Sequence, residues 1–423
     1  MLIVHITRRL PMDILPSTNE TIDSFLSKSQ QIHKEAIQRA LERYDKDIYC
    51  SIDHKRFVFI RLDERTILSS YGILRFKRRY YYDSLMEEHC YLLDNKLQIP
   101  KSKRMTNELI LRILDLASIM SYKEVGEHLS SEFVISKYTV RKTINEVLLE
   151  TYFDIGIDRK DSKIHVQIDE KFIGMVGSAG KKRYYTLTVF AGKEPIGKSY
   201  KLLNKTVVSS SKLCDLKNRL NEILVNRYKV SPDEEIFISG DFATYIQSFN
   251  ESITCCKARY VPDKFHVYKA LRDLFPGLYV DDYSLNDIGF RDHLIRELSK
   301  MDDENAKKLR KIMMNRPDAF APYLDPDYLG CSQEGQNSHI YAPRFGKYAN
   351  RFSPSTIEKL SLIREAKAMN AKVILVHKHR KIPEPIDVST PQPYEDIVKC
   401  VLDTRGMKYE TAKMFNEIKY GGL

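Results

Sequence analysis

Apolar and polar residues alternate with a period of two between residues 163 and 174. The apolar positions that share one face are Ile164, Val166 and Ile168. The polar positions on the other face are His165, Gln167 and Asp169. This period is typical of a half-buried strand, and we expect Asp169 to end it.

A second apolar run, residues 235–241, stops at Gly240 and Asp241. Between the two runs, the pattern predicts strands at residues 182–190 and 197–203 and a helix at 209–228. Three antiparallel strands, a helix, and then strands alternating with helices is the order of an RNase H-like domain. We therefore expect a mixed α/β (α+β) fold in which the first and fourth strands lie side by side and bring Asp169 and Asp241 together.

The first hundred residues predict a helical segment followed by a small β-rich unit. Apolar residues repeat with helical spacing over residues 17–44, as one long helix or two short ones, and β-formers dominate residues 55–94, with Gly72 as a break or bulge. Arg75, Lys77 and Arg79 alternate along the middle strand. Such a basic face favours contact with phosphates or, equally, a solvated strand edge protected by charge.

Residues 102–151 have the pattern of a helix-turn-helix. The third helix, opening at Ser136, turns apolar residues inward and presents Lys137, Arg141 and Lys142 outward. This is the layout that places polar side chains in a major groove, although three-helix units without DNA function are common.

Composition narrows the class of protein. The formal charge of +11 and the pI near 9.0 favour a polyanionic partner. The seven cysteines are scattered with no C-x-x-C pair, so we expect neither disulfides nor a thiolate zinc site, and a reducing cytoplasm fits best. No apolar run of about 18 residues and no signal-peptide pattern occur, so we expect no membrane span and no secretion.

The two strand-end carboxylates suggest phosphodiester chemistry. Two magnesium ions roughly 3.5–4 Å apart can activate an attacking oxygen and stabilise a leaving oxygen. Magnesium takes hard oxygen ligands and keeps several waters, so two or three carboxylates suffice, and Mn²⁺ could substitute. A single strand-end Asp is more often a cap or a solvated residue, and the matching pair shifts this balance.

Four short motifs and the basic strand together resemble a known family. The motifs are residues 168–172 (IDEKF), 239–246 (SGDFATYI), 262–268 (PDKFHVY) and 331–339 (CSQEGQNSH). Residues 71–80 (YGILRFKRRY) add to them. With these motifs the chain resembles the DDE transposases of the Lre family of bacterial insertion sequences, relatives of the Mutator-like enzymes. The resemblance covers most of the chain.

The resemblance implies an RNase H-like catalytic domain with two divalent metals. Asp169, Asp241 and Glu334 match its three catalytic, metal-binding acids. Residues Asp263 and His266 match an Asp-x-x-His element that borders the active site. We expect accessory roles for these two and for Asn337, which completes a Glu-x-x-Asn pattern.

The third acid has competitors on a clearer helix. Gly335 follows Glu334 directly, so any helix there is short and begins near Ser332. Glu358 and Glu365 lie on the helix expected at residues 355–369. We prefer Glu334 because that later helix carries mostly packing positions.

These expectations divide the chain into six parts. They are a helical segment (1–54), a basic β unit (55–100), a helix-turn-helix domain (101–155), a catalytic domain (156–276 with 331–380), a helical insertion (277–330), and a Pro-rich linker with a helical tail (381–423).

The sequence therefore predicts a transposase that binds terminal repeats of double-stranded DNA and cuts and joins strands with metal ions. By resemblance it would act as a homodimer or larger assembly in the bacterial cytoplasm, associated with the nucleoid. A nuclease of the same fold without strand transfer, and a non-catalytic helix-turn-helix DNA-binding protein, remain as alternatives. A tyrosine recombinase would need no metal, and this chain lacks a convincing partner arginine element for one.

Overall fold

The computed structural model describes residues 22–376, apart from 98, 100–103, 130, 131, 153–156, 158, 160, 161, 198 and 347–350. The expected Pro-rich linker and helical tail lie outside the described residues. The chain forms two compact units. Within the described residues, unit 1 comprises 22–112 and 127–135, and unit 2 comprises 113–126 and 136–376. No helix within the described part of the chain is long and apolar enough to cross a membrane.

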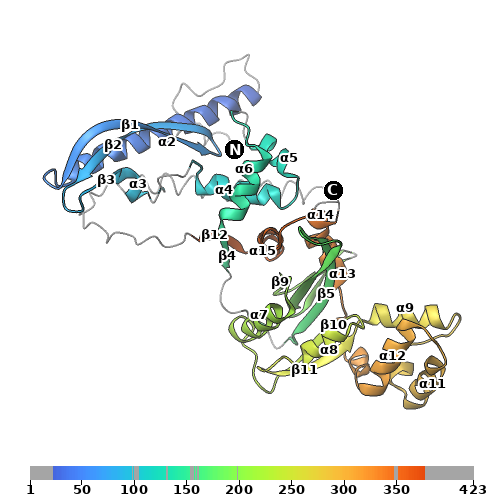
Figure 1. The fold of residues 1–423 in the computed structure, drawn as a ribbon. Helices are drawn as coiled ribbons and strands as arrows, with labels where there is room; N and C mark the ends of the chain where they lie inside the picture. The colour runs from blue at the N-terminus through green and yellow to red at the C-terminus, as the bar shows by residue number, and fades with distance from the viewer. Residues whose placement is uncertain are drawn as a thin grey trace, which may run out of the picture. The chain divides into compact units, whose positions relative to one another are not determined.

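Unit 1 packs one long helix against a three-stranded antiparallel sheet (Figure 1). The helix α2 (Ile22–Ser51) confirms the single-helix alternative and lies along the central strand. The sheet has the order β1 (Phe57–Ser69), β2 (Gly72–Asp83), β3 (Glu88–Cys90), and a short helix α3 (Leu92–Lys96) follows. Helix and sheet share one apolar core, so the two expected segments form one structure.

Gly72 opens a new strand after a tight turn, where we expected a break or bulge within one strand. Its φ of +108° lies in the region that only glycine adopts freely, which allows β1 to turn into β2 at once. Along β2, Arg75 and Lys77 are exposed. Arg79 instead forms an ion pair, in which its Nη1 lies 2.5 Å from Oδ2 of the buried Asp45.

Three helices occupy the region predicted as a helix-turn-helix: α4 (Asn107–Ala117), α5 (Tyr122–His128) and α6 (Lys137–Glu146). The backbone N–H of Thr139 donates to the Ser136 hydroxyl, which caps α6. On α6, Val140 and Ile144 are fully buried, whereas Lys137, Arg141 and Lys142 are exposed. The inward and outward faces of this helix are therefore as predicted.

Unit 2 is built on a five-stranded mixed sheet with the order β11-β10-β5-β6-β9. The strands are β5 (His165–Gly174), β6 (Lys181–Phe190), β9 (Thr206–Ser210), β10 (Glu235–Gly240) and β11 (Lys257–Pro262). The pairs β5–β6 and β6–β9 are antiparallel, and β10 runs parallel to both β5 and β11. The first and fourth strands of the sheet therefore lie side by side.

Two expectations about these strands are wrong. The third sheet strand is β9, whereas residues 197–203 mostly form β8 (Ser199–Leu202), which pairs with β7 (Lys193–Ile196) in a separate hairpin. Asp169 also does not end its strand, because β5 continues to Gly174 in its ladder with β6. What ends near Asp169 is the pairing with β10, which involves only residues 165–167 of β5.

Helices cover both faces of this sheet. The apolar face packs on α7 (Leu213–Asn226), α8 (Thr244–Asn250) and α9 (Lys264–Leu274), whose buried residues join those of β5, β6 and β10 in one core. The opposite face meets α13 (Gln333–Ile340) and α15 (Pro354–Ala368). The short helix α14 (Ala342–Phe345) lies between these two in the chain.

Between α9 and α13 the chain is helical, as predicted for the insertion. It contains α10 (Asp282–Asn286), α11 (Ile288–Ser299), α12 (Glu304–Asn315) and a 3₁₀ turn (Ala321–Leu324). Buried residues of these helices extend the sheet's core, and α12 packs against α9. The last strand, β12 (Lys372–Val376), pairs antiparallel with β4 (Leu148–Tyr152).

Candidate active site

Asp169 and Asp241 lie on neighbouring strands at one edge of the five-stranded sheet. Asp241 follows β10 directly, and Asp169 stands two residues beyond the last pair that joins β5 to β10. Gly240 allows this approach, because a Cβ atom there would lie 2.7 Å from the backbone oxygen of Ile168 and 2.5 Å from the side chain of Ile246. The Gly-Asp pair thus brings the second acid close to the first strand.

The carboxylate of Asp169 is mostly buried and receives two hydrogen bonds. The backbone N–H of Glu170 donates to Oδ1 at 2.7 Å, and Asn337 Nδ2 donates to Oδ2 at 2.7 Å. The pKa of Asp169 is raised to about 6, mainly by burial and also by the negative charge of Asp241, while the two hydrogen bonds oppose the shift. In the absence of a cation, the site therefore disfavours the ionised form of the Asp169 carboxyl, and a bound cation would favour that form.

Asn337 holds Asp169 from helix α13. Its Oδ1 accepts a hydrogen bond of 2.7 Å from the Thr186 hydroxyl on β6, and Thr186 in turn accepts from Gln333 Nε2 at 3.1 Å. Asn337, Thr186 and Gln333 are all buried. This network fixes the first turns of α13 over the sheet at the position of the first acid.

Gln167 anchors the start of the same helix, a role that sequence reasoning missed. Its side chain donates to the Gly330 carbonyl at 2.8 Å and accepts from the backbone N–H of Ser332 at 3.0 Å. The only signal in the sequence is that Gln167 shares a strand face with Asp169. A buried amide on that face needs partners, and the segment before α13 supplies them.

Asp263 and His266 form a pair at the start of α9. Asp263 caps this helix by accepting from the N–H of Phe265, and its Oδ2 lies 2.6 Å from His266 Nδ1. The hydrogen bond to Asp263 raises the pKa of His266, and the charges of Asp241 and Asp169 add to the effect. The half-exposed imidazole of His266 therefore stands within electrostatic reach of both acids, which favour its protonated form.

Glu334 lies on the first turn of α13 and is exposed. The helix begins at Gln333, as predicted, and Glu334 precedes Asn337 by three positions, which places both on one side of the helix. Among the residues described, no group of three His, Cys, Asp or Glu side chains stands close enough to hold a metal ion. The structure thus brings Asp169 and Asp241 together but does not add Glu334 to them as a third ligand.

The two competitors for the third acid differ in their surroundings. Glu358 is exposed and accepts a hydrogen bond of 3.2 Å from Ser211. Glu365 is buried, accepts from Tyr341 at 2.9 Å and from the Ser209 hydroxyl, and burial raises its pKa to about 7. Glu365 therefore has a packing role between α15 and β9.

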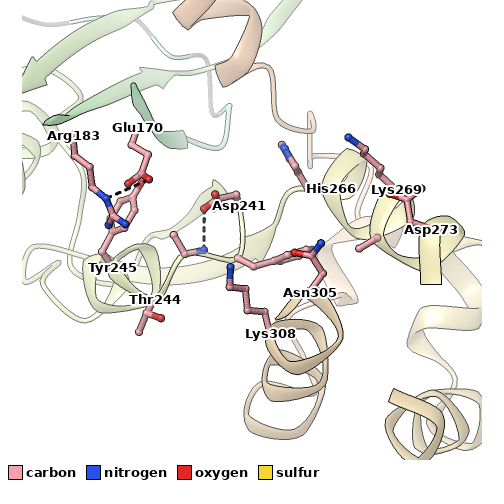
Figure 2. A pocket seen from close by; sticks show the side chains of 13 residues that line it. Glu170, Arg183, Asp241, Thr244, Tyr245, His266, Lys269, Asp273, Asn305 and Lys308 are labelled. Carbon is pink, nitrogen blue, oxygen red and sulfur yellow. Dashed lines mark hydrogen bonds and ion pairs between the residues drawn. The ribbon is translucent and has the colours of Figure 1, made fainter. Parts of the chain in front are cut away.

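A cavity of about 660 Å³ opens beside Asp241. Figure 2 shows the Glu170–Arg183 pair on one side of Asp241 and side chains of α9 and α12 on the other. The residues missed by sequence reasoning here are Arg183, Lys269, Asp273, Asn305 and Lys308. They come from a strand and two helices far apart in the sequence, and no local pattern links them.

The donor set is compatible with a hard cation. Asp169 and Asp241 offer carboxylate oxygens, which magnesium and manganese prefer. Magnesium is commonly held by one or two carboxylates, while water and substrate phosphates complete its coordination. Burial is the main cause of the raised pKa of Asp169, and the negative charge of Asp241 adds to it, so a bound cation would offset part of both effects.

Comparison with known proteins places this chain in a bacterial family. A UPF0236 protein of Caldanaerobacter subterraneus subsp. tengcongensis, whose name joins eleven designations beginning with TTE0033, is 24% identical over 363 residues, covering 79% of this chain and 74% of the relative. A second, UPF0236 protein TTE2489 of the same organism, is 22% identical over 360 residues, covering 79% and 75%.

The family model described as an uncharacterised protein family, UPF0236, matches residues 17–313. The matched segment contains Asp169, Asp241, Asp263 and His266 and ends before α13, which carries Glu334 and Asn337. Because this match covers well over half of the 423 residues, the chain belongs to the UPF0236 family.

Proposed function

We propose that this protein is the transposase of a bacterial insertion sequence, of the Lre type, which cuts and joins DNA strands with the help of divalent metal ions. The observation that carries the proposal is the juxtaposition of Asp169 and Asp241 on neighbouring parallel strands of unit 2. The strand order β11-β10-β5-β6-β9, with three antiparallel strands followed by two parallel ones, supports an RNase H-like domain.

The chain's own residues have defined tasks in this proposal. Asp169 and Asp241 hold magnesium, which when bound supplies Lewis-acid stabilisation of the attacking and leaving oxygens of a phosphodiester. Asn337 and the N–H of Glu170 orient the Asp169 carboxylate. Asp263 favours the protonated form of His266, and in that form His266 places positive charge beside the acids and lowers their repulsion of a DNA phosphate.

Glu334 remains our choice for the third acid. It precedes Asn337, whose amide contacts Asp169, by three positions on α13, and in this proposal its side chain would turn toward the pair when substrate and metal bind. Glu365 is committed to Tyr341 and Ser209, and Glu358 interacts with Ser211. Substrate binding would then complete the metal site.

Exposed basic residues support the DNA-binding part of the proposal. Lys137, Arg141 and Lys142 are exposed on α6, and Arg75 and Lys77 are exposed on β2. We omit Arg79 from the DNA-contacting set because Asp45 neutralises it. The net charge of +11 adds a general attraction to phosphates.

The names of the relatives agree with a mobile gene. One relative carries eleven designations and another four, all in one organism. Many copies of one gene in a genome are what an element that inserts itself at new places produces. By the same analogy, two protein copies would hold the two ends of the element.

Strand cleavage and joining on DNA that carries the element's own ends tests the function. We expect nicks with free 3′-hydroxyl groups in Mg²⁺ or Mn²⁺, followed by joining of those ends to a second DNA. Cleavage without joining would identify a nuclease, and binding without cleavage would identify a DNA-binding regulator. Glu334→Gln should abolish cleavage and Glu358→Gln should retain it; the reverse result would move the third acid to α15.

A further inference from the structure

The cavity beside Asp241 carries a further feature, a pair of lysines that face it from two different helices. Lys269 belongs to α9, one turn after His266, and Lys308 belongs to α12, three residues after Asn305. All four side chains line the cavity together with Asp241 (Figure 2). Residues spaced by three or four lie on one side of a helix, so each helix turns one stripe of its surface toward the acid.

The two lysines differ from Arg183 and His266, the other basic residues that line the cavity, in having no carboxylate partner among the described residues. Arg183 pairs with Glu170 at 3.5 Å, and His266 pairs with Asp263 at 2.6 Å. Within the described part of the chain, neither Lys269 nor Lys308 forms an ion pair. Both side chains are exposed to solvent, so their ammonium groups can exchange water for an anion without breaking a contact in the protein.

The surroundings select the kind of anion. The cavity is also lined by Asp241, Glu170 and Asp273. A small anion would therefore be attracted by the two lysines and repelled by these three carboxylates. A chain of phosphodiesters suits both the acidic and the basic side of the cavity. One phosphate can approach the acids through a metal ion while the neighbouring phosphates contact the lysines. A volume of about 660 Å³ lies within the range of about 300–1,000 Å³ typical of small-ligand pockets, so it fits part of one strand and not a duplex.

We propose that Lys269 and Lys308 form a phosphate clamp, which binds the backbone of one DNA strand next to the bond that is cut. The inference rests on the proposed function and deepens it, since it gives the cavity a substrate segment and gives α12 of the helical insertion a direct role at the site. The lysines are positioning residues: they hold the strand in register beside the acids that would hold the metal.

Binding and steady-state cleavage of end DNA by a Lys269→Ala/Lys308→Ala double variant test the clamp. The matched control is Lys201→Ala, an exposed lysine on the β8 hairpin that does not line the cavity. We expect KM to rise several-fold with kcat nearly unchanged, because the lost contacts bind ground state and transition state alike. The slope of log affinity against log salt should fall by about 1 for each lost phosphate contact.

Lys269→Arg/Lys308→Arg should restore both readouts, because it keeps the charges, and circular dichroism checks that all variants are folded. A double alanine variant with the KM and the salt slope of the wild type would overturn the clamp. Failure of the proposed function would look different. In that case the wild type itself would not cut DNA, while the effect of the lysines on DNA binding would still be measurable.

Discussion

Asp169→Asn should remove a loss of stability that the metal-free protein shows as the pH rises from about 4 to 6, and it should abolish cleavage. Burial and the neighbouring Asp241 raise the pKa of Asp169 from 3.8 to about 6 in the folded protein. The folded state therefore binds more protons than the unfolded state between about pH 4 and pH 6. The free energy of unfolding falls as the pH rises through this window, and asparagine, which cannot ionise, removes the fall.

The size of the effect follows from the shift. Each pKa unit corresponds to about 1.4 kcal/mol, so a shift from 3.8 to about 6 amounts to at most about 3 kcal/mol above pH 6 and to nothing below pH 4. The change in the side chain's own hydrogen bonds adds an offset that does not vary with pH. The difference in the free energy of unfolding between variant and wild type should thus grow with pH, whatever its value at pH 4.

Urea unfolding in EDTA at pH 4, 5, 6 and 7.5, followed by circular dichroism, measures this difference. Glu358→Gln removes an exposed carboxylate from α15 and should show no such growth with pH. Saturating Mg²⁺ should narrow the gap at pH 7.5, since the cation binds the folded wild type and not the variant. A difference that stays constant from pH 4 to pH 7.5 would refute the assignment of Asp169 as a buried, destabilised acid.

Three further substitutions test the framework around the acids. Asn337→Ala removes the buried donor to the Asp169 carboxylate, so we expect the free energy of unfolding in urea to fall by about 1.5–3 kcal/mol. The pKa of Asp169, measured by carbon-13 NMR, should rise further. Ser338→Ala, at an exposed position of the same helix, is the neutral control. Gly240→Ala pushes a methyl group to 2.7 Å from a backbone oxygen of β5 and should cost about 1–3 kcal/mol in thermal unfolding, whereas Gly335→Ala, with nothing within 4 Å, should be neutral or stabilising. Glu365→Gln should retain cleavage and remove a fall in stability between about pH 4.5 and pH 7, because burial raises the pKa of this carboxyl to about 7; loss of cleavage would make it part of the site.

The local pattern of the sequence predicted the centre of unit 2 well. Period-two alternation located β5, a short apolar run located β10, and the order of the elements predicted that these two strands are neighbours. The location of the two strands follows from the pattern of apolar residues, and their neighbourhood follows from the order of the elements. The sequence contains the apolar pattern and the order of the elements. The inward and outward faces of α6 were predictable for the same reason.

What the sequence could not predict depends on partners distant along the chain. The pairing of β5 with β10 ends two residues before Asp169, but the strand does not end at Asp169, because the ladder with β6 continues past it. Arg79 alternates with exposed basic residues, yet Asp45, 34 positions earlier in the chain, removes it from the exposed set. The lysines of the cavity come from two helices that meet only in the fold.

Cleavage of end DNA in Mg²⁺ by the wild type, Asp169→Asn, Asp241→Asn and the double variant tests the central claim most directly. If both acids serve one cation site, each single variant should lose nearly all activity and the double variant should lose little more, because residues that act as a unit are not additive. Normal cleavage by either single variant would contradict the account.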